Sequence, residues 1–557
     1  MAQYHPDNPC IVQSDHTILV EVHSPRYPEA RDALARFVEL VKSPEHVHTY
    51  RITPLSIWNA CAAGMVPQQI IDTLHAFAKY DVPPLVTRDI AEVAARYGIC
   101  QLRREPQGLV LVVDKPALAE EFSRHREVAP FLAARLAPDA FLIDSAQRGR
   151  LKQALIKVGY PIEDLAGYRQ GETLSMTLRR TTRTGLTFQL RPYQQEAADI
   201  FYASGTARGG AGVVLLPCGA GKTIVGLACM AQVQTSTLVL TTSVTASRQW
   251  MTEILDKTDL LADAICEYNG QSKDIRPVTV ATYNILTWRA KHTDPFRHLA
   301  LFDQRDWGLI IYDEVHLLPA PVFQVTASLQ ARRRLGLTAT LVREDGREDD
   351  VFALIGPKKV DVPWKVLERQ GWIATAQCHE IRVPMPEALR MEYAVAAQRH
   401  KFRIASENPL KMSVVRDLLA QHPDDQVLII GMYVEQLQEL AQALGITLLT
   451  GTTGQKRRDA VFEQFKAGTI RQLAVSKIAN FAVDLPDATV AIQISGTFGS
   501  RQEEAQRLGR ILRPKAGANQ AYFYTIVSQD TVEQDFALKR QLFLCEQGYQ
   551  YTIHDVE

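Results

Sequence analysis

The spacing of apolar residues changes near Leu190, where short apolar runs begin to alternate with longer segments of helical periodicity. The apolar runs have the length of buried strands and lie at residues 213–217, 237–242, 278–282, 308–313 and 334–338. Apolar strands that alternate with helices are typical of a parallel sheet covered on both faces. We therefore expect one parallel α/β lobe over residues 181–370.

A second alternating series begins near Gln426. Its predicted strands lie at 427–431, 446–449, 473–476, 490–495 and 521–527, and its predicted helices at 434–444, 455–467, 501–512 and 531–547. The spacing again favours a parallel sheet. We expect a second α/β lobe over residues 371–557.

Residues 1–105 are predicted to form a mostly helical domain. Helical spacing of apolar residues covers 28–41, 54–63, 67–78 and 86–97, and a strand-like run follows at 99–103. Short helices followed by a strand favour a winged-helix-like domain and a helical docking domain about equally.

Residues 106–180 are predicted to form a small α/β domain. A strand is expected at 109–113, and helices at 117–125 and 146–158. No residue pattern within this domain indicates catalysis. The linker that follows carries Arg179, Arg180 and Arg183, which either contact phosphates or form a solvated face.

The composition is that of a folded, multidomain protein. The chain has 557 residues, 46% of them hydrophobic, without the run of about 18 apolar residues that a membrane span needs. Its start lacks a basic segment followed by an apolar one, so we expect a cytoplasmic protein without a membrane partner. The eight cysteines form no Cys-x-x-Cys pair, which argues against a zinc or iron–sulfur site. A balance of 62 basic and 62 acidic residues neither supports nor excludes nucleic acid binding.

The predicted strand at 213–217 leads into a phosphate-binding loop. The loop contains Pro217, Cys218, Gly219, Ala220 and Gly221, and the next helix opens with Lys222 and Thr223. Small residues let the backbone N–H groups converge on one anion, to which the helix N-terminus adds partial positive charge. Lys222 would reach the β- and γ-phosphates of ATP, and Thr223 would offer its hydroxyl to Mg²⁺. The alternative is a glycine turn before an ordinary helix.

Two adjacent carboxylates, Asp313 and Glu314, end the predicted strand at 308–313. Ligands of open parallel sheets bind at the carboxyl ends of the strands, where both Lys222 and Asp313 fall. Asp313 would hold Mg²⁺ through water, and Glu314 would deprotonate the attacking water. His316 would couple the site to the neighbouring lobe. The alternative for the two acids is a helix N-cap followed by a first-turn acid.

The second lobe contains the stretch from Gln506 to Arg513, in which Gln506, Gly509, Arg510 and Arg513 have the spacing Gln-x-x-Gly-Arg-x-x-Arg. Hydrolysis of ATP needs cations against the γ-phosphate, where negative charge develops. Arginines from a second lobe reach that phosphate only when the lobes close, which would couple hydrolysis to motion. The alternative is a basic surface helix.

Together with Thr338 and Thr340, these segments resemble the motif set of superfamily 2 helicases. More narrowly, the chain resembles the XPB family of DNA repair helicases in its prokaryotic form. The similarity is carried by residues 18–22, 48–58, 335–347, 484–495 and 501–515, and it is strongest between 190 and 515. Leu216 stands where the strict phosphate-loop pattern has glycine, a departure that helicase-type loops share.

The resemblance implies two RecA-like motor lobes that use ATP and Mg²⁺ on DNA. It places Arg191 and Gln194 at the adenine, and Lys222, Thr223, Asp313 and Glu314 at the phosphates and metal. It also implies that the ATP site is completed by Gln506, Arg510 and Arg513. Residues that couple to or contact DNA would be Thr282, Thr338, Thr340, Thr450 and Gly451.

Three further regions take expected roles from the resemblance. Arg343, Glu344 and Asp345 would separate the strands, the alternative being a structural salt-bridge loop. Residues 107–175 would correspond by position to a damage-recognition domain. Residues 391–411, with Arg399, His400, Lys401 and Arg403, would form a basic thumb.

The function expected is that of an ATP-dependent 3′–5′ DNA helicase that opens duplex near damage, in nucleotide-excision-type repair and beside a nuclease partner. A duplex translocase that separates no strands is the nearest alternative. A nucleotide-gated scaffold that loads a nuclease and an RNA helicase are the others.

Overall fold

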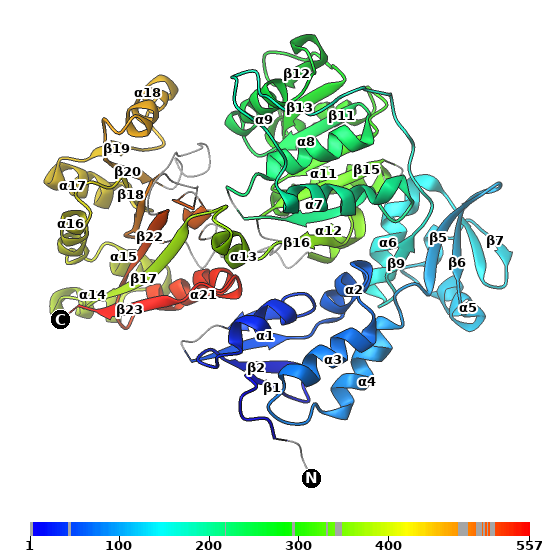
Figure 1. Cartoon of the computed structure of the whole chain (residues 1–557), viewed down its shortest axis with the longest axis horizontal. Helices are drawn as coiled ribbons and strands as arrows, with labels where there is room; N and C mark the ends of the chain where they lie inside the picture. Colours follow the sequence, from blue (N-terminus) through cyan, green and yellow to red (C-terminus); the bar gives the residue numbers. More distant parts are fainter. Residues whose placement is uncertain are drawn as a thin grey trace.

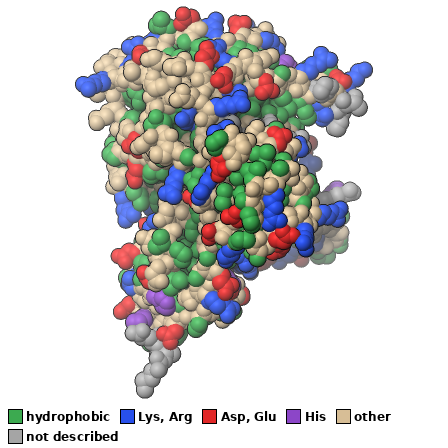
Figure 2. Space-filling view, turned by 90° about the vertical axis from the view of Figure 1, so that its right-hand side faces the viewer, with side chains coloured by type: hydrophobic (Ala, Val, Ile, Leu, Met, Phe, Trp, Pro, Cys, Tyr) green, Lys and Arg blue, Asp and Glu red, His purple; other side chains and the backbone are tan. Residues whose placement is uncertain are grey.

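The computed structural model describes residues 4–42, 46–217, 219–291, 294, 296–329, 332–339, 348–476, 488–496, 504, 507–509, 511–512 and 519–556. Its described part contains four sheets, two of them with seven strands each. The two seven-stranded sheets form separate lobes, and the N-terminal part of the chain lies below and beside them in Figure 1. On the face shown in Figure 2 basic and acidic side chains are interspersed, in keeping with the net charge of zero.

The N-terminal domain combines an antiparallel sheet with four helices. The sheet has the order β1-β2-β4-β3, with β1 Cys10–Val12, β2 Thr17–Glu21, β3 Glu39–Lys42 and β4 Val47–Arg51. The helices are α1 Tyr27–Leu34, α2 Pro54–Ala62, α3 Pro67–Phe77 and α4 Pro84–Ala94. Thr53 caps α2, because its side chain accepts the Ser56 N–H at 3.1 Å.

The prediction of a mostly helical N-terminal domain is wrong for its first fifty residues. The helix expected over 28–41 ends at Leu34, and Leu40 is buried within strand β3. The apolar residues Phe37, Val38 and Leu40 fit helical spacing as well as a short strand, so periodicity alone does not separate the two.

The small α/β domain has a five-stranded sheet of order β7-β8-β6-β5-β9. Its strands are β5 Cys100–Glu105, β6 Gly108–Val113, β7 Ala134–Ala137, β8 Ala140–Ile143 and β9 Ile162–Asp164, and its helices are α5 Pro116–Arg124 and α6 Arg148–Lys157. β5 and β6 form an antiparallel hairpin, with Cys100 opposite Val113. This hairpin spans the boundary that we expected between residues 105 and 106.

Lobe 1 is a parallel sheet of order β12-β13-β11-β14-β15-β10-β16. Its strands are β10 Ala211–Leu215, β11 Thr237–Thr241, β12 Ile265–Tyr268, β13 Val278–Thr282, β14 Leu309–Asp313, β15 Arg333–Thr338 and β16 Lys358–Asp361. Its helices are α7 Pro192–Tyr202, α8 Lys222–Val233, α9 Val244–Lys257, α10 Tyr283–Leu286, α11 Ala320–Ser328, α12 Glu348–Leu354 and α13 Trp364–Arg369.

Lobe 2 is a parallel sheet of order β19-β20-β18-β21-β22-β17-β23. Its strands are β17 Thr375–Val383, β18 Val427–Gly431, β19 Thr447–Leu449, β20 Gln472–Ser476, β21 Val490–Gln493, β22 Gln520–Ser528 and β23 Tyr551–Asp555. Its described helices are α14 Glu387–Val395, α15 Gln398–Ser406, α16 Lys411–Gln421, α17 Val434–Leu444, α18 Gln455–Lys466 and α21 Val532–Glu546.

The two lobes share one topology. When the strands are numbered from one to seven along each lobe, both sheets have the spatial order 3-4-2-5-6-1-7. The prediction of two parallel-sheet lobes of the RecA-like class is thereby confirmed. In lobe 1 this order places β15 between β14 and β10, so the ends of three neighbouring strands meet at one edge.

The N-terminal domain contacts both lobes. Leu542 and Cys545 of α21, in lobe 2, are buried in its hydrophobic core. Toward lobe 1, the Asn59 side-chain carbonyl accepts the Lys358 N–H of β16 at 3.1 Å. The small α/β domain packs on lobe 1 through α6, where Gln153 donates to Asp350 at 2.6 Å.

Candidate nucleotide site

The phosphate-binding loop lies between the buried strand β10 and helix α8. Gly219 and Gly221 have φ values of 80° and 84°, a region that favours glycine. A Cβ on Gly221 would lie 2.5 Å from the Gln194 amide nitrogen, so the loop closes only around a residue without a side chain. Cys218 lies outside the described residues.

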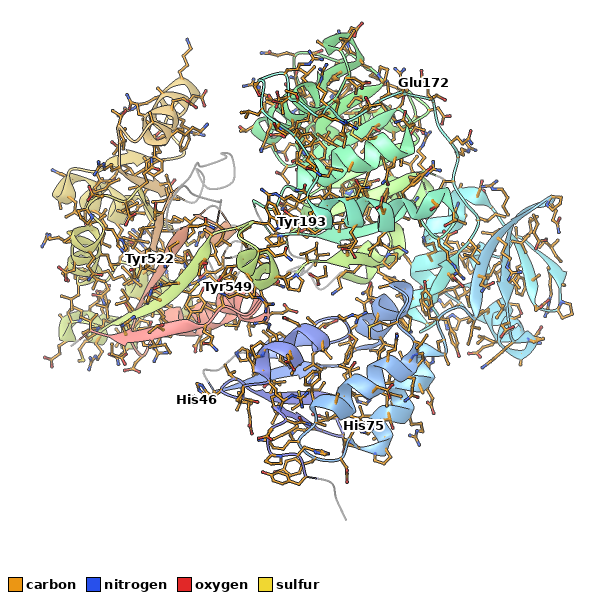
Figure 3. All side chains as sticks on the ribbon, in the orientation of Figure 1. His46, His75, Glu172, Tyr193, Tyr522 and Tyr549 are labelled. Carbon is orange, nitrogen blue, oxygen red and sulfur yellow. The ribbon has the colours of Figure 1, made fainter. Side chains whose placement is uncertain are left out.

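Helix α7 fixes the loop from the other side. The Gln194 side-chain N–H and the Tyr193 hydroxyl both donate to the Ala220 carbonyl, at 2.9 and 2.7 Å. The Arg191 guanidinium lies 4.6 Å above the Trp372 ring and donates to the Tyr193 hydroxyl at 3.0 Å. Tyr193 lies on the side of lobe 1 turned toward lobe 2 (Figure 3). The structure thus places Gln194 against the loop and Arg191 next to it through Tyr193, while their role at the adenine stays a prediction.

Tyr193 and Trp372 are contributors that the sequence analysis missed. Tyr193 stands between the two predicted residues in the same short motif, so its position was a usable signal. Trp372 follows α13 and reaches Arg191 from 181 positions away, as the weak contact of the Arg191 guanidinium with the Trp372 carbonyl shows. Periodicity along the chain gives no indication of such a contact.

Strand β14 delivers both predicted carboxylates to the same edge. The Lys222 ammonium lies 2.5 Å from a Glu314 carboxylate oxygen, although 92 positions separate the two residues. Asp313 receives the Trp250 indole N–H at 3.0 Å, and its backbone carbonyl accepts the Tyr283 hydroxyl at 2.9 Å. Lys222, Asp313 and Glu314 therefore meet as predicted, with Trp250 and Tyr283 as additional neighbours.

Glu314 also contacts the end of the neighbouring strand, β15. Its backbone has φ 49° and ψ 54°, a left-handed conformation that is uncommon for a residue with a side chain. The second Glu314 oxygen lies 3.5 Å from both the Thr338 hydroxyl and the His316 Nδ1. His316 Nδ1 and the Thr338 hydroxyl are 2.5 Å apart and buried. His316 and Thr338 thus link the Glu314 carboxylate to the end of β15.

The two carboxyls have opposite pKa shifts. Burial, and then the nearby Glu314 charge, raise the pKa of Asp313 to about 6, against the opposing effects of Lys222 and the Trp250 hydrogen bond. Burial also acts to raise the pKa of Glu314, but Lys222 and His316 outweigh it, so the pKa of Glu314 lies below its usual value. Environments that push apart the pKa values of adjacent carboxyls are typical of sites that handle protons and cations.

The groups present fit a magnesium nucleotide. The two loop glycines turn the backbone in the left-handed region without side chains, and the helix N-terminus and Lys222 supply positive charge for phosphates. Thr223, in the first turn of α8, and Asp313 supply oxygen donors, which Mg²⁺ prefers. Glu314 provides a carboxylate of lowered pKa beside them.

The predicted DNA-contact residues lie in both lobes, unlike the residues of the nucleotide site described above. Thr282 caps α10 by accepting the Ile285 N–H at 3.2 Å, and it is only 7% exposed. In lobe 2 the Thr450 hydroxyl bonds that of Thr452 at 2.9 Å, and the Gly451 carbonyl accepts an Arg458 N–H at 2.9 Å. Predictions that lie outside the described residues concern Thr340, Arg343, Glu344, Asp345, Gln506, Arg510 and Arg513.

Two basic segments have intramolecular partners. In the linker, Arg179 and Arg183 each donate to a backbone carbonyl of lobe 1 at 2.6 Å, those of Thr258 and Leu260. Arg179 and Arg183 therefore help to attach the linker to lobe 1, a contact that neither alternative of the sequence analysis included. In the predicted thumb, Arg403 pairs with Glu407 at 2.8 Å and also with Glu435.

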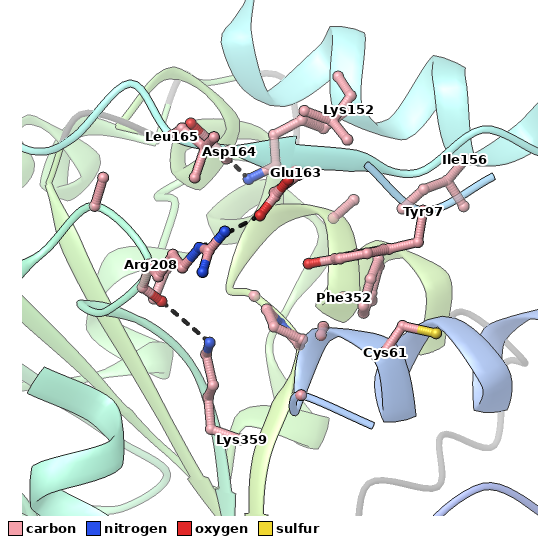
Figure 4. Close-up of a pocket in the computed structure, with 18 of the residues that line it drawn as sticks. Cys61, Tyr97, Lys152, Ile156, Glu163, Asp164, Leu165, Arg208, Phe352 and Lys359 are labelled. Carbon is pink, nitrogen blue, oxygen red and sulfur yellow. Dashed lines mark hydrogen bonds and ion pairs between the residues drawn. The ribbon is translucent and has the colours of Figure 1, made fainter. Parts of the chain in front are cut away.

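A separate cavity of about 290 Å³ lies where the N-terminal domain, the small α/β domain and lobe 1 meet (Figure 4). Inside it Lys152 pairs with Asp164 at 3.3 Å, and Arg208 lies 3.5 Å from Glu163. Lys359, on edge strand β16, donates to the Arg208 carbonyl at 3.1 Å. None of the predicted nucleotide-site residues lines this cavity.

Three family descriptions match parts of the chain. "Type III restriction enzyme, res subunit" matches residues 187–343, and "ERCC3/RAD25/XPB C-terminal helicase" matches residues 367–556. The first range contains lobe 1 from α7 through β15, and the second contains the described strands and helices of lobe 2. "Helicase conserved C-terminal domain" matches residues 10–137, which here form the N-terminal sheet and part of the small α/β domain.

Similar proteins cover almost the whole chain. The "DNA 3'-5' helicase XPB" of Kineococcus radiotolerans is 54% identical, over 99% of this chain and 97% of that protein. The protein of the same name from Mycobacterium tuberculosis is 53% identical, over 99% and 98%. The "General transcription and DNA repair factor IIH helicase/translocase subunit XPB" of Antonospora locustae is 33% identical, over 99% and 82%.

No helix among the described residues is long and apolar enough to cross a membrane. The phosphate loop, the paired carboxylates and two parallel-sheet lobes are the parts that an ATP-hydrolysing helicase requires. Given these parts and relatives of such identity over nearly its full length, the chain belongs to the XPB family of helicases.

Proposed function

We propose that the protein is an ATP-driven DNA helicase that moves 3′ to 5′ and opens duplex DNA during repair. The observation that carries the proposal is the Lys222–Glu314 ion pair beside Asp313, at the edge where β10, β14 and β15 end. That edge has the groups for phosphoryl transfer to water. The names of the relatives, which include a DNA 3'-5' helicase and a DNA repair factor, supply the polarity and the process.

In the proposed site the N–H groups of residues 219–221 and the Lys222 ammonium bind the phosphates of ATP. Arg191 and Gln194 serve the adenine side, and Gln194 also holds the loop through the Ala220 carbonyl. Thr223 and Asp313 hold Mg²⁺, which, when bound, offsets the charge that develops on the transferred phosphoryl group.

The Lys222–Glu314 pair suggests how the base is released. In this proposal the Lys222 ammonium turns from Glu314, now 2.5 Å away, to the phosphates of ATP, so nucleotide binding exchanges one anion for another. Glu314 then becomes available to accept a proton from the attacking water. Gln506, Arg510 and Arg513 of lobe 2 complete the site when the lobes close, a role that rests on the resemblance.

The contacts of Glu314 with Thr338 and His316 are the proposed route from the nucleotide to DNA. They reach the end of β15, beyond which Thr340, Arg343, Glu344 and Asp345 follow in the sequence. Thr282, Thr450 and Gly451 contact the DNA backbone in this proposal. Backbone contacts of this kind do not read bases, so DNA binding should depend little on base sequence. Pairing of Lys and Arg side chains with phosphates should make the binding weaken with salt.

The experiment that tests the proposal is steady-state ATP hydrolysis without nucleic acid and with duplex DNA, single-stranded DNA, forked DNA or RNA. Forked DNA should stimulate wild type most, and Glu314→Gln should bind ATP yet turn it over at least about 100-fold more slowly, because the base is gone. Stimulation by DNA without opening of the fork would favour a duplex translocase. Wild type and Glu314→Gln being equally slow throughout would favour a nucleotide-gated scaffold, and stronger stimulation by RNA an RNA helicase.

We also propose that residues 107–175 sense damage and that the protein acts in the cytoplasm beside a nuclease partner. The first rests on the position of the small α/β domain before lobe 1, and the second on the proposed repair function. A duplex carrying a bulky lesion should then stimulate hydrolysis more than the undamaged duplex of the same sequence. Equal stimulation by both duplexes would count against damage sensing.

A further inference from the structure

Trp250 occupies the space between two parts of the nucleotide site. It belongs to α9, the helix that follows β11, and is 1% exposed. Its indole N–H donates to Oδ2 of Asp313, the last residue of β14, at 3.0 Å. The donor and the acceptor are 63 positions apart and meet because Trp250 packs in one hydrophobic cluster with residues of α8 and β14.

The Asp313 carboxylate is held at both oxygens. Oδ1 accepts the backbone N–H of Glu314 at 3.1 Å, while Oδ2 accepts the Trp250 indole. Among the residues that the structure describes, each oxygen therefore has one donor. A carboxylate oxygen can accept two hydrogen bonds, so each keeps capacity for a metal-bound water. The two donors fix the plane of the carboxylate.

Helix α8 leaves room for the indole at Gly226. A Cβ on Gly226 would lie 2.4 Å from one indole carbon and 3.0 Å from another. Glycine inside a helix is unfavourable by roughly 1 kcal/mol relative to alanine. Its presence in the helix that starts at Lys222 is explained by the close approach of Trp250. The ring is thus fixed between the phosphate-loop helix and the Asp313 strand.

We propose that Trp250 is a positioning residue, which orients the Asp313 carboxylate for the magnesium ion that accompanies ATP. This inference rests on the proposed function, because it requires Asp313 to hold that ion. Partners that hydrogen-bond metal-binding carboxylates orient them, and removal of such a partner typically costs 10- to 100-fold in metal affinity or activity. Phosphate binding itself depends on the loop and Lys222, so it should not require Trp250.

The test is Trp250→Phe, which removes the N–H and keeps an aromatic ring between α8 and β14. Binding of a directly excited fluorescent ADP analogue is titrated with Mg²⁺ and with EDTA, and hydrolysis is measured against Mg²⁺ concentration. The expected result is about a 10-fold rise in the half-saturating Mg²⁺ concentration, with binding in EDTA unchanged. Saturating Mg²⁺ should restore most of the hydrolysis rate.

Trp307→Phe is the matched control. Trp307 is fully buried in the same lobe, and its indole N–H donates at 3.0 Å to the Leu301 carbonyl instead of a carboxylate. It should lose a similar hydrogen bond without any change in Mg²⁺ dependence. Equal Mg²⁺ dependence in wild type and both Phe variants would overturn the inference.

Gly226→Ala perturbs the same contact without altering the indole. Its Cβ would displace the Trp250 ring and so weaken the bond to Asp313, and we expect the same selective loss of Mg²⁺-dependent binding. If Trp250→Phe failed to fold, Gly226→Ala would still test the role of the Trp250–Asp313 hydrogen bond. If wild type itself showed no Mg²⁺-dependent nucleotide binding, the proposed function would fail. If wild type bound nucleotide in a Mg²⁺-dependent way and both variants did the same, only the proposed role of Trp250 would be wrong.

Discussion

At the residue scale, the nucleotide site contains residues from short sequence motifs and residues from distant parts of the chain that contact them. Lys222, Asp313 and Glu314 were predictable because each stands in a short motif at the end of an apolar strand. Trp250 and Tyr283 were not, because they reach Asp313 across 63 and 30 positions. Their identity as neighbours depends on how helices pack on the sheet, which periodicity does not specify.

Gly221 offers a direct measure of how tightly the loop closes. Gly221→Ala should weaken ATP binding and lower thermal stability, because its Cβ would lie 2.5 Å from the Gln194 amide and its φ is +84°. Gly445→Ala is the control, since Gly445 also has a left-handed φ, +69°, but no neighbouring atom within 4 Å. Both should incur a backbone cost of roughly 1–2 kcal/mol. Only Gly221→Ala should lose ATP affinity, as calorimetric titration would show; unchanged affinity would contradict the geometry.

The environment of Asp164, at the junction of the small α/β domain with lobe 1, should make the stability of the folded protein fall at acid pH. Burial acts to raise its pKa, but the Arg148 and Lys152 cations beside it hold that pKa well below its usual value. A carboxyl of lowered pKa stabilises the folded state above its ordinary pKa of roughly 4, and this contribution is lost as pH falls below that value. Asp164→Asn should therefore lower the melting temperature at pH 7 and reduce its dependence on pH below about 5.

Asp15→Asn provides the comparison for Asp164→Asn. The pKa of Asp15 is also lowered, by hydrogen bonds from Thr17, but the side chain is fully exposed. Solvent screens such a group, so its replacement should change the melting curve little. Melting temperatures followed by circular dichroism from pH 3 to 8 decide the matter. A pH profile of Asp164→Asn parallel to that of wild type would contradict the prediction.

At the scale of elements, the strands with a continuous apolar run were predictable, and those with interspersed polar residues were not. The edge strands β12 and β16 of lobe 1 read Ile-Cys-Glu-Tyr and Lys-Lys-Val-Asp, without a continuous apolar run. Edge strands are partly exposed and tolerate charge, so they lack the signal of a buried strand. In lobe 2 the interior strand β17 and the edge strand β23 were missed because polar residues are interspersed along both, whereas the edge strand β19 was predicted.

The linker before lobe 1 is attached to that lobe by hydrogen bonds from Arg179 and Arg183. Arg179→Ala combined with Arg183→Ala should lower the melting temperature of lobe 1, because each removes a side-chain bond worth about 1 kcal/mol or less. The salt dependence of DNA binding should stay that of wild type. Arg180→Ala, in the same exposed segment, is the control and should change neither quantity. A smaller salt dependence of DNA binding in the double variant would contradict this prediction and favour phosphate contact by these arginines.

At the scale of the whole molecule, the chain contains one fold twice. Both seven-stranded sheets have the same strand order, although only the first carries the phosphate-binding loop. Similar spacing of strands and helices sufficed to predict two lobes of one class. The common order itself follows from pairings between distant strands, which the sequence pattern does not indicate. The contacts of the N-terminal domain with both lobes could not be predicted from the sequence either.

The contact between the N-terminal domain and α21 can be tested by substitution within one helix. Leu542 is 7% exposed and belongs to the N-terminal core, whereas Leu538 of the same helix is 47% exposed. Leu542→Ala should cost roughly 2–5 kcal/mol of packing and speed hydrogen exchange in β3 and β4. Leu538→Ala should leave that exchange unchanged. Equal exchange in the two variants would mean that α21 does not stabilise the N-terminal domain.

The most direct measurement of the central claim is strand separation on two partial duplexes, one with a 3′ single-stranded tail and one with a 5′ tail. Wild type with ATP and Mg²⁺ should open the 3′-tailed duplex at least about tenfold faster. Glu314→Gln should bind both substrates and open neither, because its site lacks the base that activates water. Equal opening of both substrates, or opening by Glu314→Gln at the wild-type rate, would contradict an ATP-driven 3′–5′ helicase centred on this site.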